Sequence, residues 1–181
     1  MHKIVLVVLP LLLALALSSA QEKSVTSVKG ESTAMYHLSY VLHDIDATSR
    51  DIIYTASVDT AGRTIKSVSA HVDVMTFDSG NSNRDSHAME VIDALSYPEA
   101  TFVSTAVSSS HDTLTVDGKL TFHGVTRNIS SRAVSEWSAS RLAVHATFPI
   151  SLTDFHIERP SLLFVQVSDT LRFSLTAVFV P

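Results

Sequence analysis

The side chains in this sequence best suited to chemistry are its histidines, because a neutral imidazole both binds metals and exchanges protons near pH 7. The chain has nine, and all except His2 follow residue 20. His71 and Asp73 share one face of an alternating segment, but no third ligand lies near them in sequence. His-Glu-x-x-His, Gly-x-Ser-x-Gly and cysteine are all absent. The sequence therefore predicts no metal site, no catalytic residue and no cofactor.

A second group of polar side chains stands close together at 83–87. Arg84 offers a planar fork of donors that suits a phosphate or a quinone carbonyl, and Asn83, Asp85 and His87 lie beside it. These four residues are the candidate binding site for the polar end of a ligand. A structural role stays open as the alternative, in which Asp85 caps a helix and pairs with Arg84 or His87.

The segment that carries this group, NRDSHAMEVIDALSYPEA at 83–100, has helical spacing. Its apolar residues Ala88, Val91, Ile92 and Leu95 fall three or four positions apart, and Pro98 would end the helix. The rest of the chain alternates between apolar and polar residues, the period of antiparallel strands with one wet face. Such runs lie near 33–42, 51–59, 64–76, 100–108, 112–123, 125–135, 140–152 and 168–180.

Eight antiparallel strands with no repeat or linker predict one all-β domain. A closed barrel and a two-sheet sandwich both stay open on this pattern. Pro149 interrupts a good strand, so it must lie at a bulge or an edge, since proline cannot donate to the ladder. In His123-Gly124-Val125-Thr126-Arg127, Gly124 supplies the backbone freedom of a tight corner. His123 and Arg127 are predicted to flank that corner on the outer face.

The first twenty residues read as a secretory signal peptide. Lys3 precedes an apolar run from Ile4 to Leu17, and the small residues Ser18 and Ala20 fit a cleavage site after Ala20. A membrane-spanning helix needs roughly 20 residues, which this run does not reach. The expected domain is therefore 21–181, with 12 basic and 18 acidic residues once Lys3 is removed. This acidic balance argues against nucleic acid as a partner.

Three segments, taken together and in order, resemble the YceI-like family of exported bacterial proteins. They are VDGKLTFHGVTRNI at 116–129, FDSGNSNRDSHAMEVIDALSYPEATFVST at 77–105, and the closing pair FPISLTDFHI at 148–157 and VSDTLRFSLTAVF at 167–179. The chain departs from the family at 42–60, which lacks the glycines that members usually carry there.

This resemblance implies an antiparallel, eight-stranded lipocalin-like β-barrel with one helix after the third strand. It also implies that a polyisoprenoid or similar long-chain amphiphile binds inside the barrel. An eight-stranded barrel either just fills with side chains or holds one slender ligand. The expected lining comprises Tyr54, Val72, Val74, Phe102, Leu120, Phe122, Val144, Phe148, Phe173, Leu175 and Phe179. The expected mouth comprises Asn83, Arg84, Asp85 and His87.

Burial energetics permit such a ligand. One five-carbon isoprene unit contributes about 4 kcal/mol at about 0.8 kcal/mol per carbon. Three or four units therefore offset an association cost of about 4–15 kcal/mol. The residues alone equally permit a filled core, because protein interiors are usually close-packed. The alternative is thus a packed secreted β-domain that acts through surface contacts in stress response, without a lipid cavity.

The expected partner is an isoprenoid or other amphiphilic lipid. The resemblance implies a periplasmic or secreted protein that carries, stores or sequesters this lipid. No stable membrane insertion is expected once the signal peptide has been removed.

Overall fold

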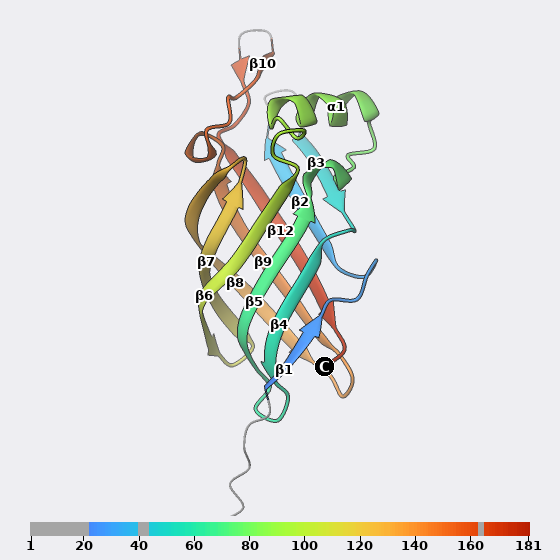
Figure 1. The fold of residues 1–181 in the computed structure, drawn as a ribbon, viewed down its shortest axis with the longest axis vertical. Coiled ribbons are helices and arrows are strands. Elements are labelled where there is room, and N and C mark those ends of the chain that lie inside the picture. Colours follow the sequence, from blue (N-terminus) through green and yellow to red (C-terminus); the bar gives the residue numbers. More distant parts are fainter. Residues whose placement is uncertain (1–21, 40–43, 163–164) are drawn as a thin grey trace, which may run out of the picture.

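The computed structural model describes residues 22–39, 44–162 and 165–181, and its main feature is one curled antiparallel sheet (Figure 1). Ten strands form this sheet in the order β1-β4-β5-β6-β7-β8-β9-β12-β2-β3. They are β1 (Glu22–Thr26), β2 (Thr33–Ser39), β3 (Asp44–Ser49), β4 (Ile53–Asp59), β5 (Thr64–Asp73), β6 (Glu99–Ser110), β7 (Thr113–Phe122), β8 (Val125–Trp137), β9 (Leu142–Ser151) and β12 (Thr170–Phe179). The short strands β10 (Ser161–Leu162) and β11 (Val165–Gln166) pair only with each other.

The structure confirms the all-β antiparallel class and the barrel, and each of the eight predicted runs contains a strand. The strand count differs, because the sheet has ten members. The additional strands β1 and β3 were not predicted, since each is short and β1 buries only Val25. The run predicted at 33–42 ends at Ser39 in the described part of the chain. The signal peptide predicted at 1–20 lies outside the described residues.

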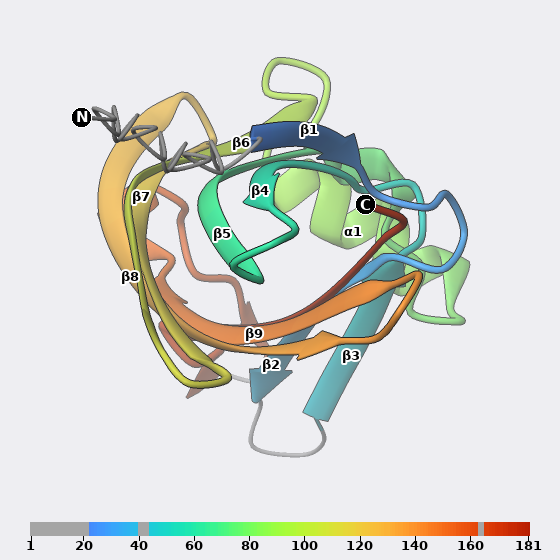
Figure 2. The same ribbon diagram turned by 90° about the horizontal axis from the view of Figure 1, so that it is seen from below.

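The two outermost strands of the sheet, β1 and β3, make contacts that close the sheet into a barrel. Ser27, which follows β1, forms a β-bridge with Phe179 at the end of β12. Thr48 of β3 forms a second bridge with Asp78. Both outermost strands are therefore tied to another part of the chain, and Figure 2 shows the strands as a ring around the interior, with α1 at the far end.

One α-helix, α1 (Ser82–Val91), covers one end of this barrel (Figure 1). It begins after Asn81, whose side chain accepts a hydrogen bond from the Arg84 amide at 3.1 Å. It ends well before Pro98, because Asp93 takes a left-handed conformation with φ 45° and the chain turns there. Leu95, placed on the apolar face of the predicted helix, is consequently 90% exposed. None of the helices in the described residues is long and apolar enough to span a membrane.

The corner at His123 and Gly124 is a two-residue hairpin loop. Phe122 pairs with Val125, and the two intervening residues both have positive φ, 49° and 70°. This is the backbone of a type I′ turn, which glycine adopts without strain. The predicted corner is thus confirmed. His123 also ties the corner down, since its Nδ1 lies 3.0 Å from the Phe155 carbonyl oxygen.

Pro149 lies in the interior of β9 and pairs with Arg172 of β12. The pairing between β8 and β9 stops at Arg132 and Thr147, so Pro149 faces no β8 partner. It therefore occupies a local edge, as its missing N–H requires. A single-turn 3-10 helix, Thr153–Phe155, lies beside this edge, and a second one, Val74–Thr76, follows β5.

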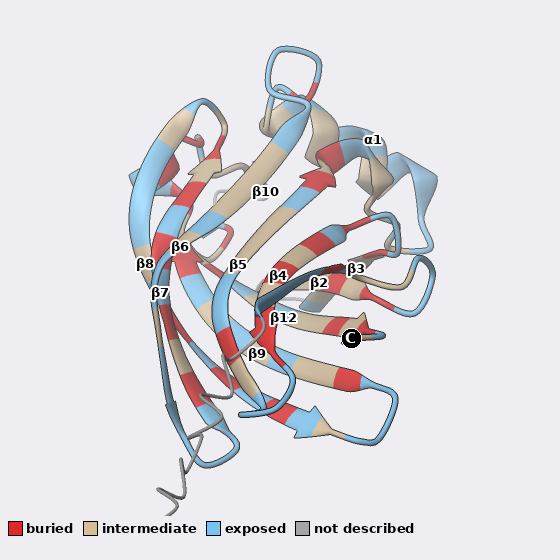
Figure 3. Cartoon of the chain, turned by 60° about the horizontal axis from the view of Figure 1, so that its bottom comes forward, coloured by how far each residue is buried: buried red, intermediate tan, exposed pale blue. Residues whose placement is uncertain are grey.

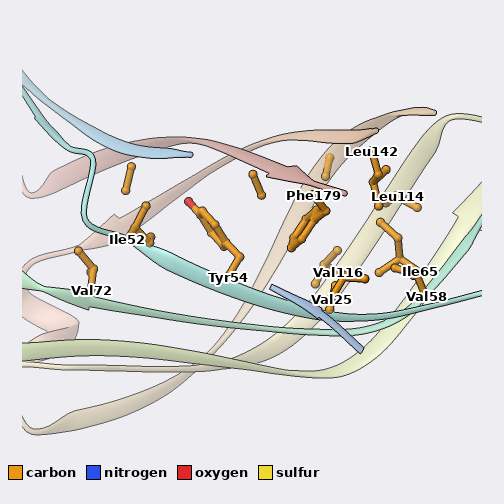
Figure 4. Packing of buried hydrophobic residues seen from close by; sticks show 14 residues of the cluster. Val25, Ile52, Tyr54, Val58, Ile65, Val72, Leu114, Val116, Leu142 and Phe179 are labelled. Carbon is orange, nitrogen blue, oxygen red and sulfur yellow. The ribbon is translucent and has the colours of Figure 1, made fainter. Parts of the chain in front are cut away.

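Burial alternates along the strands, as Figure 3 shows, and the inward residues fill the end of the barrel away from α1. We call this end the packed half. Figure 4 shows side chains of this cluster projecting from several strands into the interior. Its buried members include Val25, Tyr54, Ala56, Val58, Ile65, Leu114, Val116, Ala133, Leu142, Ala177 and Phe179. With no cysteine in the chain, burial of this kind is the main stabilising contribution.

Candidate functional site: an apolar cavity beneath the helix

The end of the barrel near α1 holds a cavity of about 610 Å³. We call this end the hollow half. Its walls are mostly aliphatic and aromatic side chains from the strands, from α1 and from the segment between β9 and β12. Those from the strands include Ala34, Tyr36, Leu38, Ala70, Val72, Ala100, Phe102, Leu120, Phe122, Phe148, Leu171, Phe173 and Leu175, and Ile52 joins them from just before β4. Two of them, Phe148 and Phe173, stack with ring centroids 5.3 Å apart.

The structure divides the predicted lining between the two halves. The residues that line the cavity are Val72, Val74, Phe102, Leu120, Phe122, Phe148, Phe173 and Leu175. Tyr54, Val144 and Phe179 do not line it, and their placement in the wall was wrong. All three face inward as predicted, but they belong to the packed half. Val144 and Phe179 lie toward the ends of β9 and β12 away from the cavity, whereas Tyr54 lies at the boundary, two residues from Ile52 of the cavity wall.

The floor of the cavity is the boundary between the two halves. In Figure 4, Tyr54 lies between two groups of side chains. Ile52 and Val72, which line the cavity, are on one side of Tyr54, and Phe179 is on the other side. Tyr54 is 3% exposed, and its hydroxyl donates to the Thr33 carbonyl oxygen at 2.9 Å. Burial raises the pKa of this phenol far above its ordinary value. The ring is therefore a neutral, hydrogen-bonded barrier between the hollow and the packed half.

The helix and the following loops supply wall residues that were not predicted as lining. From α1 and its end come Ala88, Met89, Val91 and Ile92, and from the later loops Leu152, Ile157 and Val167. The helical spacing of Ala88, Val91 and Ile92 had indicated an apolar face, but it did not show that this face would roof a cavity. Phe155, which packs on Phe122 with centroids 5.7 Å apart, supports the loop side of the same roof.

Three of the four predicted mouth residues, Asn83, Arg84 and His87, line the cavity. Asn83 and His87 are exposed, so the cavity reaches the surface beside α1. Asp85 is not among the lining residues, and it does not cap the helix, since Asn81 does. The structure therefore contradicts the placement of Asp85 at the mouth, and also its role as cap in the structural alternative.

Ser79 links Arg84 to Asp85. The Ser79 hydroxyl donates to Asp85 Oδ1 and accepts from Arg84 Nε at 2.9 Å, while Arg84 Nη2 donates to the Ser79 carbonyl oxygen at 3.0 Å. Asp85 thus orients Arg84 through a shared serine. Because a guanidinium has five N–H donors, donors remain on Arg84 for a group in the cavity mouth.

Tyr36 adds a hydroxyl to the same wall, a contribution the sequence did not indicate. It lines the cavity and packs against Phe77 with ring centroids 5.4 Å apart. Burial raises the pKa of Tyr36, the negative charge of Asp85 raises it further, and Arg84 opposes both. The phenol therefore stays neutral at physiological pH. Within the described residues no group of three or more His, Asp, Glu or Cys is placed to hold a metal.

The fold and the cavity together define an antiparallel, lipocalin-like β-barrel with one packed and one hollow half. The chain belongs to the YceI-like family, since the sequence profile of the YceI-like domain matches residues 20–179. It is 33% identical over 133 residues to a UPF0312 protein of Pseudomonas putida, covering 68% of each chain. To a UPF0312 protein of Pseudomonas syringae it is 32% identical over 149 residues, covering 77% of this chain and 74% of the relative.

Solved structures share the fold. BcnA of Burkholderia cenocepacia superposes with a TM-score of 0.76 at 20% identity, over 84% of this chain and 98% of that one. A polyisoprenoid binding domain from Saccharophagus degradans, implicated in plant cell wall breakdown, gives a TM-score of 0.66 at 15% identity, over 89% of this chain and all of the other. At these identities the likeness concerns the fold.

Proposed function

We propose that this protein binds a polyisoprenoid or similar long-chain amphiphile in the hollow half of its barrel. The observation that carries the proposal is the apolar cavity of about 610 Å³ beneath α1, which falls within the range of about 300–1,000 Å³ typical of small-molecule sites. A packed β-domain that acts through its surface would fill this volume with its own side chains. Membership of the YceI-like family and the name of the Saccharophagus neighbour support the same ligand class.

The apolar chain of the ligand would supply most of the affinity. Each buried isoprene unit contributes about 4 kcal/mol at about 0.8 kcal/mol per carbon, and this attraction has no direction. The apolar walls therefore accept polyprenols, quinones and acyl chains of similar girth. A polar head would bind at the mouth, where Arg84 has free donors and Tyr36 a neutral hydroxyl. An anionic head such as a phosphate matches the guanidinium best.

We also propose that the protein binds its ligand without transforming it, as a carrier or a sequestering protein. The residues around the cavity favour this, because the walls are chiefly hydrocarbon and the polar mouth residue Arg84 is hydrogen-bonded to Ser79. Catalysis on an isoprenoid would require a group at the cavity wall that is placed to exchange a proton or attack a carbon.

The proposal is tested by purifying the protein from its own host without detergent. Native mass spectrometry should record a bound non-protein mass, and solvent extraction should identify it as an isoprenoid-type lipid. Lipid-free protein should take up a labelled polyprenol at one per chain. A protein that arrives empty and takes up no polyprenol would contradict the proposal and favour the packed surface-acting domain.

We propose in addition that the chain is exported and loses residues 1–20. The basic Lys3, the apolar run that follows it and the small residues Ser18 and Ala20 support export. N-terminal sequencing of protein recovered from the periplasmic fraction or the medium should begin at Gln21. A chain that keeps its first twenty residues and stays with the membrane would contradict cleavage.

A further inference from the structure

We infer that the cavity accepts about four isoprene units of its ligand, so that the protein selects chains by length. The inference rests on the proposed function, because it specifies the ligand of the same cavity. Its starting point is volume. A chain carbon occupies about as much space as a water molecule in the liquid, about 30 Å³. A cavity of about 610 Å³ therefore holds about 20 carbons, or about four five-carbon units.

The position of the floor sets this limit. Tyr54 on β4 pairs with Ala70 on β5, and Ala70 pairs with Phe102 on β6. Ala70 and Phe102 line the cavity, whereas Tyr54 lies just below it. The next inward residue along β4, Ala56, is 1% exposed and belongs to the packed half. The hollow half thus ends at this row of paired residues.

Two rings from this row, those of Tyr54 and Phe102, keep the floor in place. The Tyr54 hydroxyl is bonded to the backbone of β2 through the Thr33 carbonyl oxygen, so the ring is held at both ends. The Phe102 ring lies over Gly118, where a Cβ would be 2.3 Å from Phe102 Cζ. Phe102 therefore already occupies the space nearest the β7 backbone and cannot move further outward. A longer chain could pass the floor only by displacing these rings and the buried residues beneath them.

Chains longer than about four units would leave their remaining units in water. Each unit that enters the cavity removes apolar surface from water, and each unit that does not enter adds no such burial. Affinity should therefore rise steeply with chain length and then become constant. The length at which it becomes constant measures the depth of the hollow half.

The experiment uses lipid-free protein and unlabelled prenyl alcohols of two to eight isoprene units, each competing against one fluorescent prenyl probe. For the native sequence, each added unit should tighten binding by at least about tenfold up to about four units, and by less than about twofold beyond five. A critical micelle measurement for each alcohol keeps all titrations in the monomeric range.

Three variants locate the floor. Tyr54→Ala removes the ring and should move the plateau to longer chains by about one unit. Tyr54→Phe keeps the ring, loses only the hydroxyl, and should leave the plateau where it is. Ala70→Phe adds a ring on the cavity side and should move the plateau to shorter chains. Should Tyr54→Ala fail to fold, the opposite shift in Ala70→Phe still tests the same floor.

The outcomes separate the length limit from the proposed function. Two results would overturn the length limit and leave lipid binding intact. One is binding that tightens with every isoprene unit up to eight, and the other is a plateau that stays at the same chain length in Ala70→Phe. Absence of binding for alcohols of every length overturns the proposed function and the length limit with it. A plateau at about four units that moves as stated supports both.

Discussion

The ring of Phe102 on β6 lies over Gly118 on β7, close enough that no side chain fits between them. A Cβ at Gly118 would stand 2.3 Å from Phe102 Cζ and 2.5 Å from the Val103 carbonyl oxygen. Gly118 is buried in an otherwise regular strand, between Val116 of the packed half and Leu120 of the hollow half. Glycine occurs here because another backbone and a ring approach this position closely.

Gly118→Ala should therefore destabilise the fold. The added methyl has to displace either the Phe102 ring or the β6 backbone, and overpacking of this kind costs about 1–3 kcal/mol. Urea unfolding followed by circular dichroism measures the loss. The double variant Gly118→Ala, Phe102→Leu should cost less than the sum of the two single changes, since the smaller side chain makes room. If the losses in unfolding free energy of the two single variants simply added up in the double variant, contact with Phe102 would not be the cause of the destabilisation by Gly118→Ala.

A matched pair of substitutions should separate the two halves of the barrel. Ala70 and Ala146 are both half-buried and both pack against the buried core of the packed half, but only Ala70 lines the cavity. Ala70→Phe extends into the cavity, shortens the chain it can hold, and should weaken uptake of a labelled polyprenol with little change in stability. Ala146→Phe overfills a packed region and should lower the free energy of unfolding by about 1–3 kcal/mol. Its folded fraction should still take up the lipid, and equal uptake by both variants would contradict the assignment of the cavity.

Arg84 should discriminate between ligand head groups. A hydrogen bond to a charged group contributes about 1.5–3 kcal/mol, or roughly tenfold or more in affinity. Arg84→Ala should thus weaken binding of a prenyl phosphate by at least about tenfold and that of the matching alcohol much less. The control is Arg141→Ala, which removes an arginine paired with Glu31 and absent from the cavity lining. If Arg84→Ala weakened the binding of the phosphate and of the alcohol equally, the only role of Arg84 would be its hydrogen bonds to Ser79.

Asp169 should make the loop beside the cavity sensitive to acid. It accepts hydrogen bonds from the Ser151 hydroxyl at 2.6 Å and from the hydroxyl and amide of Thr153 at 2.6 and 3.0 Å. These hydrogen bonds hold the pKa of the Asp169 carboxyl below its ordinary value, and the bond from Ser151 has the largest effect. A carboxyl whose pKa is lowered by folding stabilises the fold above its unfolded pKa of about 3.9, and this contribution is lost as the pH falls through the folded value.

The expected result is a loss of amide protection around Thr153–Phe155 below about pH 4, the unfolded pKa region of an aspartate. Hydrogen exchange, expressed as protection factors to remove the intrinsic effect of pH, measures this loss. Asp169→Asn should show low protection at every pH, because an amide cannot accept the same three bonds as a carboxylate. Protection in the native sequence that stays constant down to pH 3 would contradict the role of Asp169.

Sequence patterns predicted the strands well where alternation was long. β7, with four inward apolar residues and the tight corner at Gly124, could be predicted almost to the residue. β1 and β3 could not, since five or six residues with few apolar members give no clear period. The end of α1 was misplaced because the helical spacing continues past Asp93, whose left-handed backbone the pattern does not reveal.

The candidate site was predicted less completely, for a geometric reason. Alternation shows which face of a strand points inward, and Tyr54, Val144 and Phe179 do point inward. It does not show the height of a residue within the barrel, which depends on strand tilt and on register between strands distant in sequence. Contacts such as that of Tyr54 with Thr33 are likewise long-range, so local spacing could not have located the floor.

The division of one barrel into a packed and a hollow half separates two demands on the sequence. Residues such as Leu142, Val58 and Phe179 maintain the folded state with 0–1% exposure, and none of them touches the cavity. Residues around Ala70 and Phe148 face empty space, so changing their size alters the shape of the cavity while the packed half is left unchanged. Relatives with this architecture are therefore free to change their ligand by substitutions at one end while the other end preserves the barrel.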